Sequence, residues 1–515
     1  MKIKILIFLM LLCAISSRVS SQTYSVSDSV ALLAIDVACD ASDSLNWDTE
    51  PDPGNWDGVT WNSDNPKRVS ELYVNNKSLT DVIDVTALTS LTDIQCSYNQ
   101  LTGLDPSTLT DLTYLSCSNN QITALDVSAL TNLTYLGCAT NQISSLDLSA
   151  LTNLLYLRCF SNQLTGLDVS ALTNLTKLYC QSNQLTMLDV STLTNLTYLG
   201  CAANQISSLD LSALTNLTEL ECSINQLTSL DVSALFNLTG LYCSYNQLAT
   251  LDVSALAYLT NFWCDNNQLT GLDVSSLANL TELYCQSNQI TVLSISELTN
   301  LTELYCSDNQ LTELDVSSLT NLAALECYGN RLPFSSLATG LHVGDYTYSP
   351  QDTLFEPESI SGNTTIDYSA EALIDGTATQ FVFYKDGSEA ETNTTGLFTT
   401  TGPGEYFCSM TNTKFPDMTL TTAIVTITEA TGVDYVHESG FIFYPNPVAD
   451  KLNIRLSEND LPSMTGIYTM DGKELIFIEN TASTFEIDMG TLQPGIYILK
   501  ITTPELSIEE EIVKL

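Results

Sequence analysis

The chain has 515 residues, more than one ordinary hydrophobic core organises, so the sequence predicts three or four structural units. Its 60 acidic residues against 16 basic ones give a formal net charge of −44 at pH 7. Nucleic acids and anionic membrane surfaces are therefore poor partners, because both are recognised through lysine and arginine. Basic ligands, neutral glycans and divalent cations remain possible.

The first 21 residues have the pattern of a secretory signal peptide. Lys2 and Lys4 precede an apolar run over residues 5–15, and small and polar residues lead to a cleavage position after Ser21. No later stretch reaches the ~18–20 consecutive apolar residues of a membrane span. The sequence therefore predicts an exported protein with no transmembrane segment in the mature chain.

Residues 22–68 differ in composition from the rest of the chain. They include Trp47, Trp56 and Trp61 and a single cysteine, Cys39. We interpret the tryptophans as apolar cover for the open end of a repeat array, because the first unit of such an array has no preceding neighbour. This role as an amino-terminal cap is favoured over a ligand-binding tryptophan cluster.

A 21-residue unit then repeats from about position 91 to about position 330. Its pattern is L-x-x-L-x-C-x-x-N-x-[LI], as in Leu133, Leu136, Cys138, Asn141 and Ile143. A period of this length predicts a solenoid, in which each unit buries its apolar face only by stacking on its neighbours. The cysteines mark the step without an insertion: Cys96, Cys117, Cys138, Cys159, Cys180, Cys201, Cys222, Cys243, Cys264, Cys285, Cys306 and Cys327.

The residues in the inward-pointing columns of the repeat are predicted to have structural roles. The leucine two positions before each cysteine, and the cysteine itself, point inward from a short strand. We interpret the cysteines as small buried hydrophobes, since sulfurs in a line ~4.8 Å apart suit neither disulfide geometry nor a clustered metal site. The asparagine column, from Asn99 to Asn330, is expected to satisfy backbone groups at the strand ends.

An aspartate column runs from Asp105 to Asp315, with Ser294 replacing one member. Pro106 directly follows Asp105, as at an N-cap and first helical position, so each aspartate is expected to cap a short helical or 3₁₀ turn. Calcium binding along this column is the alternative. Calcium takes six to eight oxygen ligands, however, and the neighbours here are mainly valine and leucine. No other cofactor is predicted.

The repeat pattern resembles the leucine-rich repeat family, with cysteine where the family more often has leucine. The stretch L-T-N-L-T-x-L, as in residues 130–136, is similar to the short repeats of internalin-like bacterial surface proteins. The motifs A-L-L, N-W-x-G-V and R-V-x-x-L in and just after residues 22–68 resemble the cap of plant receptor-like leucine-rich repeats, without its paired cysteines. The resemblance implies a parallel sheet on a concave face and short helical or 3₁₀ turns on a convex face, over residues 69–345.

Outward positions on the concave face vary between units, so they can encode a partner. Exposed aromatic side chains on a rigid scaffold anchor many interfaces and also stack on sugar rings, which predicts two ligand-binding clusters. The alternative is that aromatic residues here only favour strand pairing. The first cluster contains Tyr114, Tyr135, Tyr156, Arg158, Phe160, Tyr179 and Tyr198. The second contains Tyr242, Trp263, Tyr284 and Tyr305, edged by Asp265, Glu282 and Glu303.

The sequence offers little for catalysis. Its two histidines, His342 and His437, lie outside the repeats, and it has no H-E-x-x-H zinc motif, glycine-rich phosphate loop or nucleophile elbow. Carboxylate pairs such as Glu219 with Glu221 would lie on an open sheet, with no dry cleft to raise a pKa. We therefore predict that the protein is not an enzyme.

Residues 346–430 contain short alternating strands bounded by Gly, Asp and Pro turns. The stretch GEYFCSMTN resembles strand F of an immunoglobulin-like sandwich, with Tyr406 two residues before Cys408 as in a tyrosine corner. The partner cysteine and core tryptophan of antibody domains are missing. The prediction is an immunoglobulin-like β-sandwich that acts as a stalk.

Residues 433–515 resemble the carboxy-terminal sorting domain of the type IX secretion system. The motifs FIFYPNPVADKLNIRL, YTMDGKE and IDMGTLQPGIYILKI occur in order at the end of the sequence. This resemblance implies the type IX machinery as a partner, export across the outer membrane, and surface attachment or release after removal of the domain. The matching positions include Tyr444, Pro445, Asn446, Pro447, Gly495 and Lys500.

The sequence thus predicts a β-rich leucine-rich-repeat solenoid followed by two small β-sandwich domains, located at the outer cell surface. The predicted function is binding of a protein or polysaccharide through the concave face, for adhesion or substrate capture. The alternative is a structural surface-layer or biofilm component without a discrete ligand.

Overall fold

The computed structural model describes residues 24–40, 44–45, 47–337, 344–355, 358–428, 435–436, 442–444, 447–455, 463–470, 472–480, 484–503 and 507–514. The predicted signal peptide and its cleavage position lie outside these residues. The chain forms two compact units that divide after Leu354, except that Lys414–Met418 belongs to the first.

The first unit begins with helix α2 (Val26–Cys39), 3₁₀ helix η2 (Pro53–Asn55) and strand β1 (Val59–Trp61). Trp47 and Trp56 are buried, and their stacked rings have centroids 6.1 Å apart. Each of the three indole N–H groups, including that of Trp61, donates to a backbone carbonyl. Trp47 and Trp56 therefore lie in the core of the amino-terminal segment, with the partly exposed Trp61 beside Trp56.

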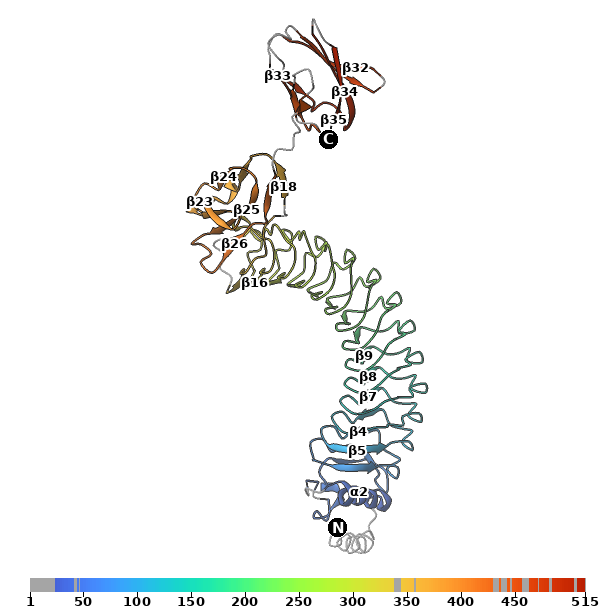
Figure 1. Ribbon diagram of the computed structural model, residues 1–515. Coiled ribbons are helices and arrows are strands. Elements are labelled where there is room, and N and C mark those ends of the chain that lie inside the picture. Colours follow the sequence, from blue (N-terminus) through green and yellow to red (C-terminus); the bar gives the residue numbers. More distant parts are fainter. Residues whose placement is uncertain are drawn as a thin grey trace. The chain divides into compact units, whose positions relative to one another are not determined.

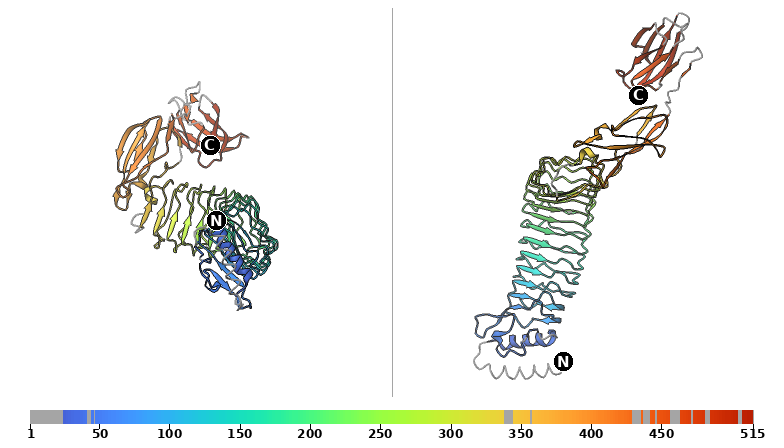
Figure 2. Two further views of the ribbon diagram at one scale, coloured as in Figure 1. Left: turned by 90° about the horizontal axis from the view of Figure 1, so that it is seen from below. Right: turned by 90° about the vertical axis from the view of Figure 1, so that its left-hand side faces the viewer.

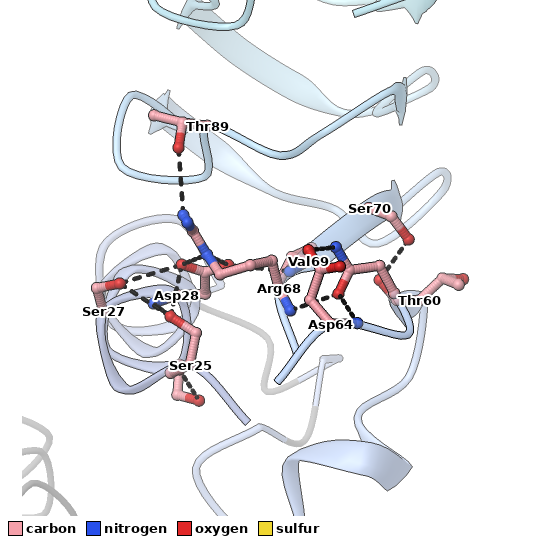
Figure 3. A network of polar contacts seen from close by, with 11 residues as sticks. Ser25, Ser27, Asp28, Thr60, Asp64, Arg68, Val69, Ser70 and Thr89 are labelled. Atoms are coloured by element: carbon pink, nitrogen blue, oxygen red, sulfur yellow. Dashed lines mark hydrogen bonds and ion pairs between the residues drawn. The ribbon is translucent and has the colours of Figure 1, made fainter. Parts of the chain in front are cut away.

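A buried ion pair joins α2 to the first parallel strand, β2 (Val69–Tyr73). The carboxylate of Asp28 is fully buried and accepts hydrogen bonds from the Ser25 hydroxyl, Arg68 Nε and the Val69 amide, each at 2.9 Å (Figure 3). A buried carboxylate is costly unless its oxygens are paired in this way. The network thus fixes the helix over the open end of the stack.

The repeat sheet has 15 strands, and every pair after β1–β2 is parallel. In Figures 1 and 2 the strands line the inner side of the solenoid and the turns lie on its outer side. A short second sheet pairs β3 (Thr80–Asp84) with β5 (Gln100–Asp105). The parallel strands after β2 are β4 (Asp93–Gln95), β6 (Tyr114–Ser116), β7 (Tyr135–Gly137), β8 (Tyr156–Arg158), β9 (Lys177–Tyr179), β10 (Tyr198–Gly200), β11 (Glu219–Glu221), β12 (Gly240–Tyr242), β13 (Asn261–Trp263), β14 (Glu282–Tyr284), β15 (Glu303–Tyr305), β16 (Ala324–Glu326) and β17 (Asp345–Thr347).

The register stacks each repeat column on itself. Leu136, for example, pairs with Leu115 and Leu157, and all three side chains are fully buried. The repeat cysteines are also fully buried, and none of the described cysteines is in a disulfide. Burial raises the pKa of Cys138 to about 12. The predicted role of the cysteines as small buried hydrophobes is confirmed.

The asparagine column satisfies the backbone where each strand ends. Asn141 Nδ2 donates to the carbonyls of Cys117 (3.1 Å) and Cys138 (3.0 Å), and its Oδ1 accepts from the Ile122 amide at 3.0 Å. The same three contacts recur at Asn330, at the far end of the column. One side chain thus ties together two successive units, as predicted.

The predicted helical or 3₁₀ turns of the convex face are wrong, because β-turns occupy these positions. Asp126 Oδ1 accepts from the Ser128 amide (3.0 Å) and hydroxyl (2.6 Å). The Leu130 amide then bonds to the Val127 carbonyl, and the Leu133 amide to that of Leu130. These two turns share only Leu130, so no continuous series of three-residue hydrogen bonds develops. Two linked β-turns are therefore enough to produce the three-residue spacing of the buried leucines.

The solenoid also extends past the end predicted at residue 345, into residues that the sequence analysis assigns to the β-sandwich. Strand β17 continues the parallel sheet beside β16. Gln351 stands 21 residues after the last asparagine and replaces it: its amide donates to the Cys327 carbonyl (2.9 Å) and accepts from the Leu332 amide (3.0 Å). Tyrosine and glutamine at the leucine, cysteine and asparagine positions conceal this last turn in the sequence.

The second unit begins with a six-stranded sheet and two strand pairs. Tyr406 is buried, and its hydroxyl donates to the Gly402 carbonyl at 2.7 Å, the contact expected of a tyrosine corner. Phe381, Phe383 and Cys408 are buried in the same region. The sheet follows the order β18 (Glu358–Ser361), β27 (Val425–Thr428), β25 (Gly404–Thr411), β22 (Gln380–Lys385), β23 (Ser388–Asn393), with β26 (Thr419–Thr421) on β25; the pairs are β19 (Thr365–Asp367) with β24 (Leu397–Thr399), and β20 (Leu373–Ile374) with β21 (Thr377–Ala378).

The end of the chain contributes two four-stranded sheets whose side chains share one core. Phe443 and Leu452 from the first sheet pack in one cluster with Ile467, Leu499 and Ile512 from the second. No helix within the described residues is long and apolar enough to cross a membrane. The first sheet is β28 (Tyr435–Val436), β29 (Ile442–Tyr444), β30 (Lys451–Arg455) and β33 (Thr484–Asp488); the second is β32 (Glu474–Asn480), β31 (Ser463–Thr469), β34 (Gly495–Thr502) and β35 (Ser507–Lys514).

Candidate functional site on the concave sheet

The concave face of the solenoid consists of the first and third residues of each three-residue strand. The middle residue points into the core, as Leu283 does in β14, and its two neighbours are only half-buried. A strand this short therefore gives the surface two variable positions per turn. The structure places the predicted tyrosines and Trp263 at these positions, whereas Phe160 lies two residues after the end of β8.

Four aromatic side chains form a continuous row across strands β12 to β15. We call these four residues, together with Glu282 and Glu303, the acidic aromatic row. Trp263 stacks on Tyr284 with centroids 4.9 Å apart and planes 7° apart, and Tyr284 stacks on Tyr305 at 4.5 Å. Tyr242 contacts Trp263 edge-on at 4.9 Å. Mutual stacking fixes these rings, and all four residues stay only partly buried.

The carboxylates of the acidic aromatic row are bonded to its rings. Trp263 Nε1 donates to Glu282 at 3.2 Å, and the Tyr284 hydroxyl donates to Glu303. Burial, followed by the bond to Glu303, raises the pKa of Tyr284. Each carboxylate is thereby held at the edge of an aromatic ring, which favours a ligand group that is both apolar and positively charged.

The first predicted cluster forms a second row, the basic aromatic row, across strands β6 to β9. Tyr114 stacks on Tyr135 at 4.2 Å, with planes 5° apart, and Tyr135 lies 6.3 Å from Tyr156. The exposed guanidinium of Arg158 lies over the ring of Tyr179. This row therefore has the opposite charge to the acidic aromatic row. Its remaining members are Phe160 and Lys177.

Two predicted site residues are buried and offer little surface to a ligand. Tyr198 is 9% exposed, because it stacks on Tyr179 at 4.3 Å and the Gln181 amide lies 3.3 Å from its hydroxyl. Asp265 is 7% exposed and accepts from the Ser244 hydroxyl. Both residues support their neighbours in the sheet.

Sequence analysis missed the column two residues after each cysteine. All its members have a positive φ, and the unit after β11 places Ile224 there at φ 55°, with Tyr245 in the next unit at φ 54°. This conformation suits Asn or Gly and is strained for a β-branched residue. Both side chains are 56% exposed. Ile224 and Tyr245 are bulky, whereas other units have Asn119 or Asn266 in this column. That difference was the signal in the sequence that could have identified them as candidate site residues.

The aspartate column shows no metal-binding geometry. Its carboxylates are exposed and each accepts hydrogen bonds from the residue two positions later, as Asp168 does from Ser170. These bonds lower the pKa of Asp168. Among the residues that the structure describes, no three His, Cys, Asp or Glu side chains lie close enough together to hold a metal ion.

The predicted sorting residues are spread over two sheets. Tyr444 is exposed at the end of β29, and Lys500 on β34 forms an ion pair with Glu509 at 2.6 Å. Gly495 begins β34, and Pro447 lies just before β30. Pro445 and Asn446 lie outside the described residues.

Comparison with protein families matches two parts of the chain. Residues 442–514 match the secretion system C-terminal sorting domain, and residues 110–151, 194–235 and 278–316 match leucine-rich repeats in two copies. No curated protein matches the chain. The sorting domain indicates export and attachment at the cell surface, as predicted.

Comparison with solved structures identifies internalins of Listeria monocytogenes. The functional domain of InlJ, which includes a cysteine ladder, is 33% identical over 70% of this chain and 90% of its own, with a TM-score of 0.52. The internalin InlF is 26% identical over 55% of this chain and 87% of its own, with a TM-score of 0.42. The chain therefore belongs to the internalin-like leucine-rich repeat surface proteins, and it carries a type IX sorting domain for secretion.

Proposed function

We propose that this secreted surface protein is an adhesin or capture protein that binds another protein through the concave face. The acidic aromatic row carries this proposal, because three stacked rings and one edge-on ring stay partly exposed beside two carboxylates. Aromatic side chains held by their neighbours lose little conformational freedom on binding and bury a large area. A purely structural strand has no need of carboxylates bonded to its outward rings.

The charge of the chain supports a partner with a basic surface. A net charge of −44 attracts such a partner over long range, and the row then offers Glu282 and Glu303 beside apolar rings. A polysaccharide ligand would use the same rings by stacking. Its hydroxyls could also donate to the carboxylates, but Trp263, Tyr284 and Tyr305 cover one another's ring faces, so the protein partner is the better fit.

We also propose roles for the two carboxy-terminal parts. Residues 346–430 are proposed to form an immunoglobulin-like β-sandwich that acts as a stalk, supported by the Tyr406 contact with Gly402. Residues 433–515 are proposed to form a second small sandwich, supported by the shared core of its two sheets. Catalysis has no part in this proposal, because the carboxylates of the concave face lie on an open sheet.

The test is a binding screen of the full-length chain against protein and glycan arrays. We expect a protein hit that the W263A/Y284A variant loses, while the F236A/Y258A variant keeps it. Phe236 and Tyr258 are matched controls, because they are exposed aromatic residues in the turns of the convex side. A glycan hit dependent on Trp263 would overturn the protein assignment. Equal binding by both variants would overturn the concave site.

A further inference from the structure

The repeat array concentrates its positive charge at one place. Between Lys77 and Arg331 the sequence has only two basic side chains, Arg158 and Lys177. The strands that carry them, β8 and β9, are neighbours, so both cations lie in the basic aromatic row. No ion pair between described residues involves either side chain. No carboxylate of those residues therefore neutralises the two charges.

Aromatic rings hold both cations. The Arg158 guanidinium carbon lies 5.2 Å from the ring centroid of Tyr179 and 5.5 Å from that of Phe160, and Lys177 Nζ lies 6.0 Å from that of Tyr156. Contacts of this kind orient a cation and leave its N–H donors free for an acceptor. The site is thus pre-organised without being occupied by the protein's own groups.

A hollow of about 290 Å³ lies beside the guanidinium of Arg158. Its other walls include the aromatic rings of Phe160, Tyr135 and Tyr98, with the polar side chains of Ser118 and Asn119. A water molecule takes ~30 Å³ of liquid volume, so a hollow of this size has room for an acidic side chain. Its lining offers one fixed cation and several hydrogen-bond donors.

Building on the proposed function, we propose that Arg158 forms a carboxylate subsite for an acidic side chain of the protein ligand, and that Lys177 adds a second positive charge from the first position of the neighbouring strand. The ligand then lies with its acidic end on the basic aromatic row and its basic end on the acidic aromatic row. An arginine fork matches a carboxylate in two parallel hydrogen bonds. The polarity of the face therefore sets the direction in which the ligand binds.

The surrounding charge requires this bipolar ligand. A wholly acidic segment would be repelled by a chain of net charge −44, so its carboxylate must arrive on a ligand that also carries basic groups. Glu219 and Glu221 are on β11, two strands from β9, so about 10 Å separates the two strands. This distance is close to the length over which physiological salt screens the interaction between charges. The two rows therefore act as separate charges.

The distance between the rows sets the length of the ligand. Six strand spacings separate β8 from β14, which at ~4.8 Å each gives about 29 Å. An extended peptide covers ~3.3 Å per residue, so about nine residues connect the two charged ends. A shorter connection leaves one end unbound.

The experiment measures peptide binding to the full-length chain by calorimetry at physiological ionic strength. The probe has four glutamates, a nine-residue Gly/Ser linker and four lysines; a comparison peptide has glutamine in place of glutamate. We expect the glutamates to tighten binding about tenfold, since a second bound end adds effective concentration. A three-residue linker should remove the gain. If general repulsion by the acidic chain dominated, adding glutamates would instead weaken the binding of the peptide.

The decisive variant is R158Q/K177Q. The peptide with glutamates should bind this variant more weakly than the peptide with glutamines does. T152E/T173E is its control, because it changes the net charge equally at exposed convex positions and should retain the gain. Thermal melts confirm that each variant folds. Glutamates that weaken binding to the wild type, or a gain that survives R158Q/K177Q, would overturn the subsite. A sialylated glycan that binds through Arg158 more tightly than the peptide would overturn the protein assignment.

The experiments distinguish failure of the carboxylate subsite from failure of the proposed binding site on the concave face. If the array hit depends on Trp263 and Tyr284 but is indifferent to R158Q/K177Q, the proposed function stands and the carboxylate subsite fails. If both pairs of substitutions leave the hit unchanged, both proposals fail.

Discussion

Neighbouring residues of the same strand in this solenoid differ in what constrains them. In β11, Leu220 points inward and stacks on the leucines of the adjoining turns, whereas Glu219 and Glu221 point outward. The inward position is repeated because each copy must fit the next copy in a close-packed core. The outward positions escape that requirement. Regularity in this protein therefore reflects packing, and the proposed recognition uses the positions that depart from it.

The largest expected effect is at an inward position. In N204A, the carbonyls of Cys180 and Cys201 lose a donor and the Leu185 amide loses its acceptor. Buried unpaired groups cost about 1–3 kcal/mol each, so we expect a loss of about 3 kcal/mol in the free energy of unfolding. Urea unfolding measures it. The outward control Y242A should lose less than about 1 kcal/mol; equal losses would contradict the distinction.

The buried cysteines predict an alkaline limit to stability. Burial raises the pKa of Cys201 and Cys285 to about 12, against 9.0 for an exposed thiol. Unfolded thiols ionise near pH 9 while folded ones stay protonated, so this stability is complete below pH 9 and is lost as pH rises toward 12. The urea midpoint should fall across that range, and less steeply in C201A/C285A. A midpoint that stays constant to pH 11 would be inconsistent with neutral buried thiols.

A smaller and opposite effect is expected at the strained column. Replacing Ile224 by asparagine should stabilise the fold by about 1 kcal/mol, because asparagine tolerates a positive φ. Binding of the array hit should weaken at the same time if the exposed side chain contacts the ligand. N266A serves as the reverse control and should destabilise. A less stable I224N protein would show that the isoleucine makes supporting contacts.

The smallest effect is expected on the convex side. Hydrogen bonds from serine lower the pKa values of Asp126, Asp147 and Asp168, so their contribution is present at neutral pH and is lost as pH falls below the ordinary value of 3.8. The triple Asp→Asn variant should keep its turns and show a shallower acid decline in Tm. EDTA should leave the wild-type Tm unchanged. A drop on chelation would instead support calcium binding.

The sequence predicted the repeated interior well, because stacking makes one residue type recur at a fixed step. The cysteine and asparagine columns could be placed inward from spacing alone. The convex turns were misjudged, since leucines three residues apart fit both a 3₁₀ helix and two linked β-turns. The last turn was missed because Tyr346, Tyr348 and Gln351 replace the residues that mark the repeat.

The site was predictable in part. Alternation along each strand placed Trp263 and Tyr284 on the outer face. It could not show that Tyr198 is covered, because this depends on the Gln181 side chain from the preceding unit. Nor could it find the clamp between Asp28 and Arg68, which joins residues 40 positions apart through a helix that the repeat pattern does not encode.

Hydroxyl-radical footprinting of the full-length chain, with and without the protein partner found on the array, shows whether the concave face binds the partner. Trp263, Tyr284 and Tyr305 should become several-fold less oxidised in the complex, while Phe236 and Tyr258 on the convex side should be oxidised at the same rate. Protection confined to the convex side, with the concave rings unchanged, would contradict this expectation.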